Sequence, residues 1–162
     1  MDELTASIVM PAFGYIFKQA PNSSYPAFCS VEEIVHGVPT IIEGAGGQIK
    51  FTPIVAEHGD IHALGFRMGN VAYLPDMKRI TDAASLKSLE NLDVLIVDAL
   101  REINHPAHMS LSESLAFINS VNPRRAILTN MHSDLDYNGL KKRLPDNVEP
   151  GFDGMRVTVV AK

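Results

Sequence analysis

The chain has 162 residues, 46% of them hydrophobic, and a formal net charge of −5, a composition typical of one soluble globular domain. No apolar run approaches the roughly 18 residues that cross a bilayer, and no basic region precedes an apolar N-terminal stretch, so we expect a cytoplasmic protein with no membrane partner. The single cysteine excludes an internal disulfide and a cysteine-based zinc site. The longest basic cluster is the triplet 141–143, which argues against an extended nucleic-acid partner.

The N-terminal region combines a helical segment with an irregular one. Residues 2–10 predict a short helix that Pro11 ends or kinks. Residues 13–28 are rich in aromatic side chains and contain two prolines, which predicts either an ordered loop over the core or a partly mobile surface segment. Residues 31–35 and 40–43 are short strand candidates.

The stretch from Phe51 to Met77 has the strongest strand pattern in the chain. A long strand over residues 48–57 ends at His58. Gly69 and Asn70 separate two further β-rich runs, which is a hairpin signal because such turns need positive φ. The second strand of this hairpin leads to Asp76, so the sequence places a histidine and a carboxylate at neighbouring strand ends.

After Asp76 the pattern alternates between helices and strands. We expect helices at 82–89, 110–121 and 136–144, and strands at 93–97, 125–128 and 155–160. Ser110 and Glu113 have the spacing of a capping box, which marks the start of the second of these helices. The alternation predicts an α/β fold, and no linker divides residues 1–162 into two domains.

Polar side chains follow the predicted buried strands, and each has a plain structural explanation as a capping or hydrogen-bonding residue. They are His58, Asp76, Asp98 and His132, with His108 in a loop between two elements. Their joint occurrence at one edge of an α/β sheet favours a functional site there. Histidine and carboxylate together suit Zn²⁺, Mn²⁺ or iron as the metal.

The chain resembles the second half of a metallo-β-lactamase-fold hydrolase. The stretches that carry this resemblance are EHGDIHALGFRMGNVAYLPD, VLIVDAL, HMSLSESL, AILTNMHSDLDY and VEPGFDGM. They are most similar to the phosphodiesterases that act on cyclic ribose phosphates in the carbon–phosphorus lyase pathway. The resemblance implies the C-terminal half of an αβ/βα sandwich, with a mixed sheet and flanking helices. It also implies two divalent transition-metal ions (Zn or Mn), a small phosphodiester or nucleotide substrate, and a homodimer.

The resemblance assigns roles to individual residues. His58 matches a histidine that binds the first metal, and Asp76 matches the carboxylate that bridges both metals. His108 matches a histidine that contacts the phosphate or assists the leaving group. Asn130 stands where the family has its last metal-binding histidine; His132, two residues on, points to the same face of an extended segment and could replace it.

One family feature is absent from this sequence. No HxHxDH motif, which supplies up to four metal ligands in the family, occurs in residues 1–162. We therefore expect the C-terminal part of a longer enzyme, a phosphodiesterase when complete, with an incomplete metal site in this chain alone. The alternatives are a non-catalytic fragment with a weak phosphate or nucleotide pocket, and an ester or thioester hydrolase of the same fold.

Overall fold

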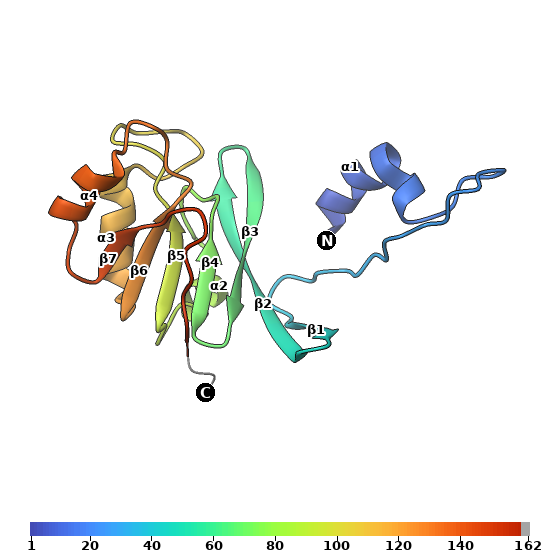
Figure 1. Cartoon of the computed structure of the whole chain (residues 1–162), viewed down its shortest axis with the longest axis horizontal. Coiled ribbons are helices and arrows are strands. Elements are labelled where there is room, and N and C mark those ends of the chain that lie inside the picture. Colours follow the sequence, from blue (N-terminus) through green and yellow to red (C-terminus); the bar gives the residue numbers. More distant parts are fainter. Residues whose placement is uncertain (160–162) are drawn as a thin grey trace.

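The computed structural model describes residues 1–159 and contains one mixed sheet with helices beside it (Figure 1). The helices are α1 (Glu3–Phe13), the 3-10 turn η1 (Gly14–Ile16), α2 (Ala83–Lys87), α3 (Leu111–Val121) and α4 (Tyr137–Arg143). The strands are β1 (Thr40–Gly44), β2 (Gly47–His58), β3 (Ile61–Met68), β4 (Val71–Leu74), β5 (Val94–Asp98), β6 (Arg125–Thr129) and β7 (Val148–Pro150). The α/β class and the mixed sheet with flanking helices are confirmed.

The seven strands lie in the sheet in chain order. Strands β1 to β4 pair antiparallel, whereas β4 to β7 pair parallel through crossovers that contain α2, α3 and α4. Because β3 is antiparallel to both β2 and β4, strands β2, β4, β5 and β6 all run in the same direction. Their carboxyl ends therefore meet at one edge of the sheet.

The hairpin between β3 and β4 forms as the sequence predicts. Met68 pairs with Val71, which leaves Gly69 and Asn70 as the turn. Gly69 has φ +56°, a conformation that an L side chain rarely adopts. The hairpin thereby fixes where β4 ends, two residues before Asp76.

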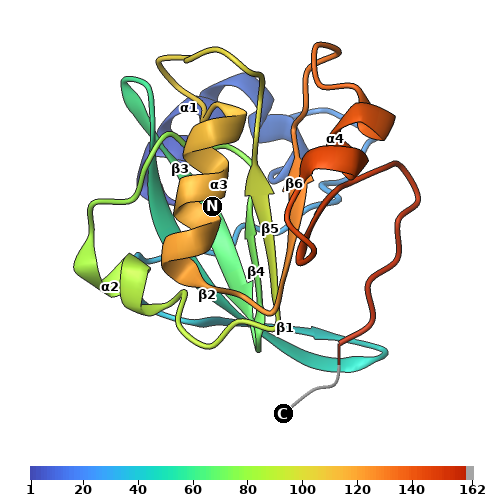
Figure 2. The same ribbon diagram turned by 90° about the vertical axis from the view of Figure 1, so that its left-hand side faces the viewer.

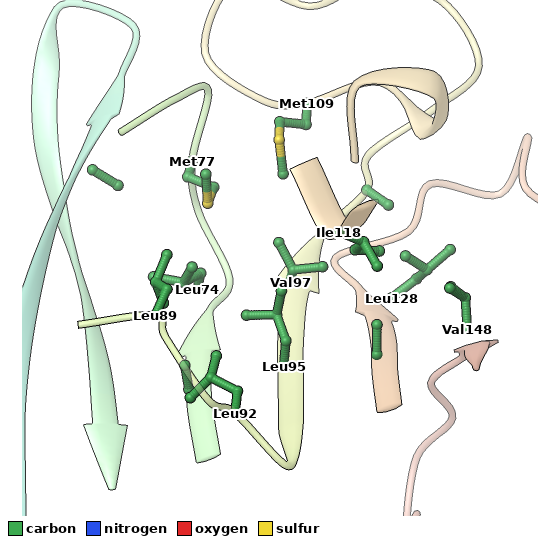
Figure 3. Close-up of a cluster of buried hydrophobic side chains, with 14 of the residues drawn as sticks. Leu74, Met77, Leu89, Leu92, Leu95, Val97, Met109, Ile118, Leu128 and Val148 are labelled. Carbon is green, nitrogen blue, oxygen red and sulfur yellow. The ribbon is translucent and has the colours of Figure 1, made fainter. Parts of the chain in front are cut away.

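The helices α2, α3 and α4 cover one face of the sheet, while the N-terminal segment lies on the other side (Figure 2). Alternate strand residues point toward these helices, so Leu95 and Val97 of β5 and Leu128 of β6 lie in the core with Ile118 of α3 (Figure 3). Ser110 and Glu113 form the predicted capping box at the start of α3. This layer of helices packs its apolar side chains against β4, β5 and β6, whose register is set by their parallel pairing.

The N-terminal region differs from the expectation of a loop over the core. No residue in the range 1–50 is buried, and 31–35 forms no strand. Helix α1 continues through Pro11 to Phe13. Aromatic composition alone did not reveal that this segment makes so few core contacts. Among residues 1–159, no helix has both the length and the apolar character needed to cross a membrane.

The last predicted strand is also misplaced. The structure forms β7 at Val148–Pro150, which pairs parallel to β6, and residues 155–159 form no strand; residue 160 lies outside the described residues. The segment after β7 crosses the sheet face opposite the helices. Together with Ile96 and Ile127 of that face it lines a hollow of about 420 Å³.

Candidate metal and catalytic site

The predicted site residues gather at the carboxyl edge of the sheet. His58 is the last residue of β2, Asp76 follows β4, and His108 lies in the loop between β5 and α3. One ligand atom from each of these three residues lies within 4.8 Å of those of the other two. Residues far apart in the sequence thus form one group because the strands that carry them run in the same direction.

A buried methionine follows each of two site residues, Asp76 and His108. Met77 and Met109 are 0% and 2% exposed, and both belong to the core cluster in Figure 3. The Met109 N–H donates to the carbonyl of Met77 at 3.0 Å, which joins the two segments. The apolar side chains anchor these segments in the core, next to the exposed Asp76 and the largely buried His108.

Asp98 is the buried partner of His108. Its Oδ2 lies 2.7 Å from His108 Nδ1 and also accepts from the Met77 N–H at 3.1 Å. Burial raises the pKa of the Asp98 carboxyl, and the hydrogen bonds from His108 and Met77 oppose this rise. The carboxylate can only accept when ionised, so it places the His108 proton on Nδ1 and orients the ring.

The ring of His58 is oriented in the same manner by a backbone carbonyl. Its Nδ1 lies 3.0 Å from the oxygen of Ala107, and its ring packs edge-on against that of His108 with centroids 4.5 Å apart. Among residues 1–159, Nε2 of neither ring has a hydrogen-bond partner. Two such imidazoles beside the exposed carboxylate of Asp76 form a donor set that fits a divalent transition metal.

Asn130 completes the polar cluster, and its contacts could not be predicted from the sequence. It follows β6 in the left-handed conformation, with φ +58°. Its side-chain Nδ2 lies 3.5 Å from Asp76 Oδ1 and 3.4 Å from Asp98 Oδ1, so the two amide hydrogens can reach both carboxylates. The sequence indicated only that Asn130 stands at the place of the family's last metal-binding histidine.

His132 lies outside the group formed by His58, Asp76 and His108. Its exposed side chain places Nδ1 3.1 Å from Asp134 Oδ1. Asp98 and Asp134 thus contact His108 and His132 respectively. Whether Asn130 or His132 takes the last metal-ligand place stays a prediction.

A third imidazole, His105, stands beside His108, with ring centroids 5.1 Å apart. From the sequence it looks like an ordinary polar loop residue. Partial burial, with the nearby Arg101 and His108, lowers the pKa of His105. No sequence signal distinguished it, because its position depends on how the loop folds back over the site.

The comparisons with known proteins agree with this architecture. A model of the beta-lactamase superfamily domain matches residues 4–131. The chain belongs to the beta-lactamase superfamily. A solved diphosphatase of the PhnP family is 28% identical, with a TM-score of 0.81 over 99% of this chain and 57% of that one. The predicted resemblance is thereby confirmed for the superfamily and for its PhnP-type members.

Two further proteins are similar to this chain at lower sequence identity. The metallo-beta-lactamase fold protein YhfI from Bacillus subtilis is 14% identical, with a TM-score of 0.67 over 90% of this chain and 60% of that one, which shows a shared fold. An octanoyltransferase from Porphyromonas gingivalis is 24% identical over 91% of this chain. The chain spans 29% of the length of that curated relative and 57% of that of the solved diphosphatase.

Proposed function

We propose that the chain supplies part of the active site of a metal-dependent phosphodiesterase that acts on small cyclic or nucleotide phosphodiesters. The observation that carries the proposal is the group of His58, Asp76 and His108 within 4.8 Å, with buried Asp98 behind His108. The 28% identity to a diphosphatase supports a phosphoryl substrate.

His58 and Asp76 are the proposed metal ligands. Ala107 holds the His58 proton on Nδ1, which leaves the Nε2 lone pair for a metal, and Asp76 offers an exposed carboxylate. Divalent ions in such sites, here Zn or Mn, act as Lewis acids and lower the pKa of bound water. The chain's own contribution is to fix these ligands on strand ends, where little side-chain freedom is left to lose.

His108 has the proposed catalytic role. With its Nδ1 proton held by Asp98 at 2.7 Å, the ring can use Nε2 to contact the phosphate or give a proton to the leaving oxygen. Asp98 balances the positive charge of the imidazolium form. Asn130 bonds to both Asp76 and Asp98 and so links the ligand side of the site to the catalytic side.

We further propose that residues 1–162 act as the C-terminal part of a longer metallo-β-lactamase-fold unit that brings the remaining ligands. The share of the solved diphosphatase that this chain spans, 57% of its length, supports this view. Within the chain, His132 or Asn130 would supply the last ligand. The homodimer and the cytoplasmic location stay predictions, of which light scattering tests the first.

The test is Zn²⁺ and Mn²⁺ binding by calorimetry, together with turnover of bis(p-nitrophenyl) phosphate. Both are measured on this chain and on a version extended at its N-terminus by the natural upstream sequence. We expect Asp76→Asn to abolish metal binding and Asp146→Asn, at an exposed position before β7, to preserve it. His108→Gln should keep the metal and lose turnover if His108 is catalytic, whereas loss of the metal would make it a ligand. An extended form without metal affinity would refute the mechanism.

A second candidate is an ester or thioester hydrolase, which the 24% identity to an octanoyltransferase favours. It would use the same metal ligands with an acyl substrate. Turnover of p-nitrophenyl octanoate at a kcat/KM above that of the phosphodiester would support it. Under this candidate His108→Ala should reduce both activities equally.

A further inference from the structure

Ala107 contacts two histidines of the site through its two backbone polar groups. Its carbonyl oxygen lies 3.0 Å from Nδ1 of His58, and its N–H donates to Nδ1 of His105 at 3.2 Å. A carbonyl can only accept and an N–H can only donate. One residue therefore sets opposite tautomers: His58 carries its proton on Nδ1, and neutral His105 carries its proton on Nε2.

The two rings are consequently suited to different partners. His58 presents the bare Nε2 that a metal requires, whereas Nε2–H of His105 is a hydrogen-bond donor that cannot bind a metal without changing tautomer. By distance, His105 lies outside the group of potential ligands, and its ring lies 5.1 Å from that of His108. The neutral ring of His105 thus offers a hydrogen-bond donor, its Nε2–H, beside the metal site.

The loop that carries His105 is held in place by two cations. Arg101 donates to the carbonyl oxygens of Ile103 and Asn104 at 3.2 and 2.8 Å. Lys78 Nζ bonds to Asn104 Oδ1 at 2.5 Å and to Glu113 Oε1 at 2.6 Å, which ties the loop to α3. A donor on such a loop is positioned before a ligand arrives, which favours binding because less ordering is needed.

We propose that His105 is a substrate-binding residue that donates its Nε2–H to an anionic oxygen of the phosphate group. This inference rests on the proposed function and adds to it a residue outside the metal ligands and His108. A phosphoryl oxygen is the acceptor of matching chemistry, and a hydrogen bond to a charged acceptor is stronger than one between neutral groups. His105 would orient the phosphate while His108 serves the leaving oxygen.

The tautomers are tested first, by ¹⁵N NMR of histidine-labelled protein at a pH where the rings are neutral. We expect the proton on Nε2 in His105 and on Nδ1 in His58. A bare Nε2 in His105 would overturn the inference. This measurement does not depend on activity or on metal.

The binding role is tested by titration with inorganic phosphate. His105→Phe keeps a ring and removes the donor, and His105→Gln keeps an N–H; the matched control is exposed His62→Gln in β3. We expect His105→Phe to weaken phosphate binding about tenfold. The phosphate affinity of His105→Gln should stay within about threefold of that of the natural chain, and the affinity of the His62→Gln control should equal that of the natural chain. Equal binding by the Phe variant, or no binding by the natural chain, would overturn the role.

Zn²⁺ binding and phosphodiester turnover separate this inference from the proposed function, and both are measured on the N-terminally extended chain with and without His105→Phe. If the natural chain and His105→Phe turn over with the same KM, only the role of His105 fails. If the N-terminally extended chain neither binds Zn²⁺ nor turns over, the proposed function fails, and the phosphate titration still decides on His105.

Discussion

Asp98 Oδ2 lies 2.7 Å from His108 Nδ1, and the carboxylate is completely buried at the end of β5. A charge in such a place is costly unless hydrogen bonds compensate it. His108, the Met77 N–H and the Asn130 amide supply this compensation. The Asp98–His108 pair contributes little net stability, because the cost of burying the charge offsets the hydrogen bonds. Its effect is to orient the ring of His108 at the site.

We expect Asp98→Asn to reduce turnover by roughly 10–100-fold, the usual effect of removing the partner of a site histidine. The control is Asp146→Asn, an exposed carboxylate in the turn before β7. Activity is measured with bis(p-nitrophenyl) phosphate on the metal-loaded form. Unchanged turnover in the Asp98 variant would show that His108 needs no carboxylate.

The same substitution should change the pH dependence of stability. Burial raises the folded pKa of Asp98 above the unfolded value of 3.8, so the folded state binds its proton more tightly than the unfolded state. The natural chain therefore loses stability as pH rises from below 3.8 through the folded pKa, and Asp98→Asn lacks this loss. Urea unfolding across this acidic range should show that the free energy of unfolding of Asp98→Asn increases relative to that of the natural chain as pH rises.

Two serines of α3 provide a test of how the helix supports the site. Ser114 is 0% exposed, and its Oγ donates to the backbone oxygen of Asp98 at 2.7 Å. Exposed Ser120 bonds only within its own helix, to the oxygen of Phe117. We expect Ser114→Ala to lower the free energy of unfolding by about 1 kcal/mol and Ser120→Ala to change it by less than about 0.5 kcal/mol. Equal effects in urea unfolding would contradict this role.

Lys78 should control the order of the loop that carries His105 and His108. Lys78→Met removes the contacts to Asn104 and Glu113 and keeps a similar apolar stem. We expect faster amide hydrogen exchange in residues 101–108 than in the natural chain, while the strands keep their protection. The control is Lys87→Met at the end of α2. Unchanged exchange in the loop would show that Arg101 alone suffices to hold it.

The sequence predicts features that depend on neighbouring residues. The hairpin turn at Gly69, the capping box at Ser110 and the polar residues at strand ends all follow local rules, and the structure has them. Since parallel strands end at one edge, the meeting of His58 and Asp76 also follows from topology.

Features set by distant contacts were beyond sequence reasoning. Strand β7 is only three residues long and exists through its pairing with β6, so it has no periodic pattern of its own. The opposite tautomers of His58 and His105 depend on where the Ala107 peptide lies. The exposed N-terminal segment has an apolar composition that resembles a core segment, yet none of residues 1–50 is buried.

Gly65 of β3 is expected to tolerate no side chain. A Cβ there would lie 2.2 Å from Leu74 Cδ2 and 2.7 Å from the Tyr73 carbonyl oxygen, and the backbone oxygen cannot move without disturbing β4. Gly44 of β1 has nothing within 4 Å of the same position, which makes it the matched control. Gly65→Ala should therefore lower the free energy of unfolding by about 1–3 kcal/mol, whereas Gly44→Ala should leave it within about 0.5 kcal/mol. Because β4 leads to Asp76, the Gly65 variant should also weaken Zn²⁺ binding, measured by calorimetry beside urea unfolding. Full stability in Gly65→Ala would mean that β3 and β4 can separate without cost, and the rigid placement of Asp76 would then be wrong.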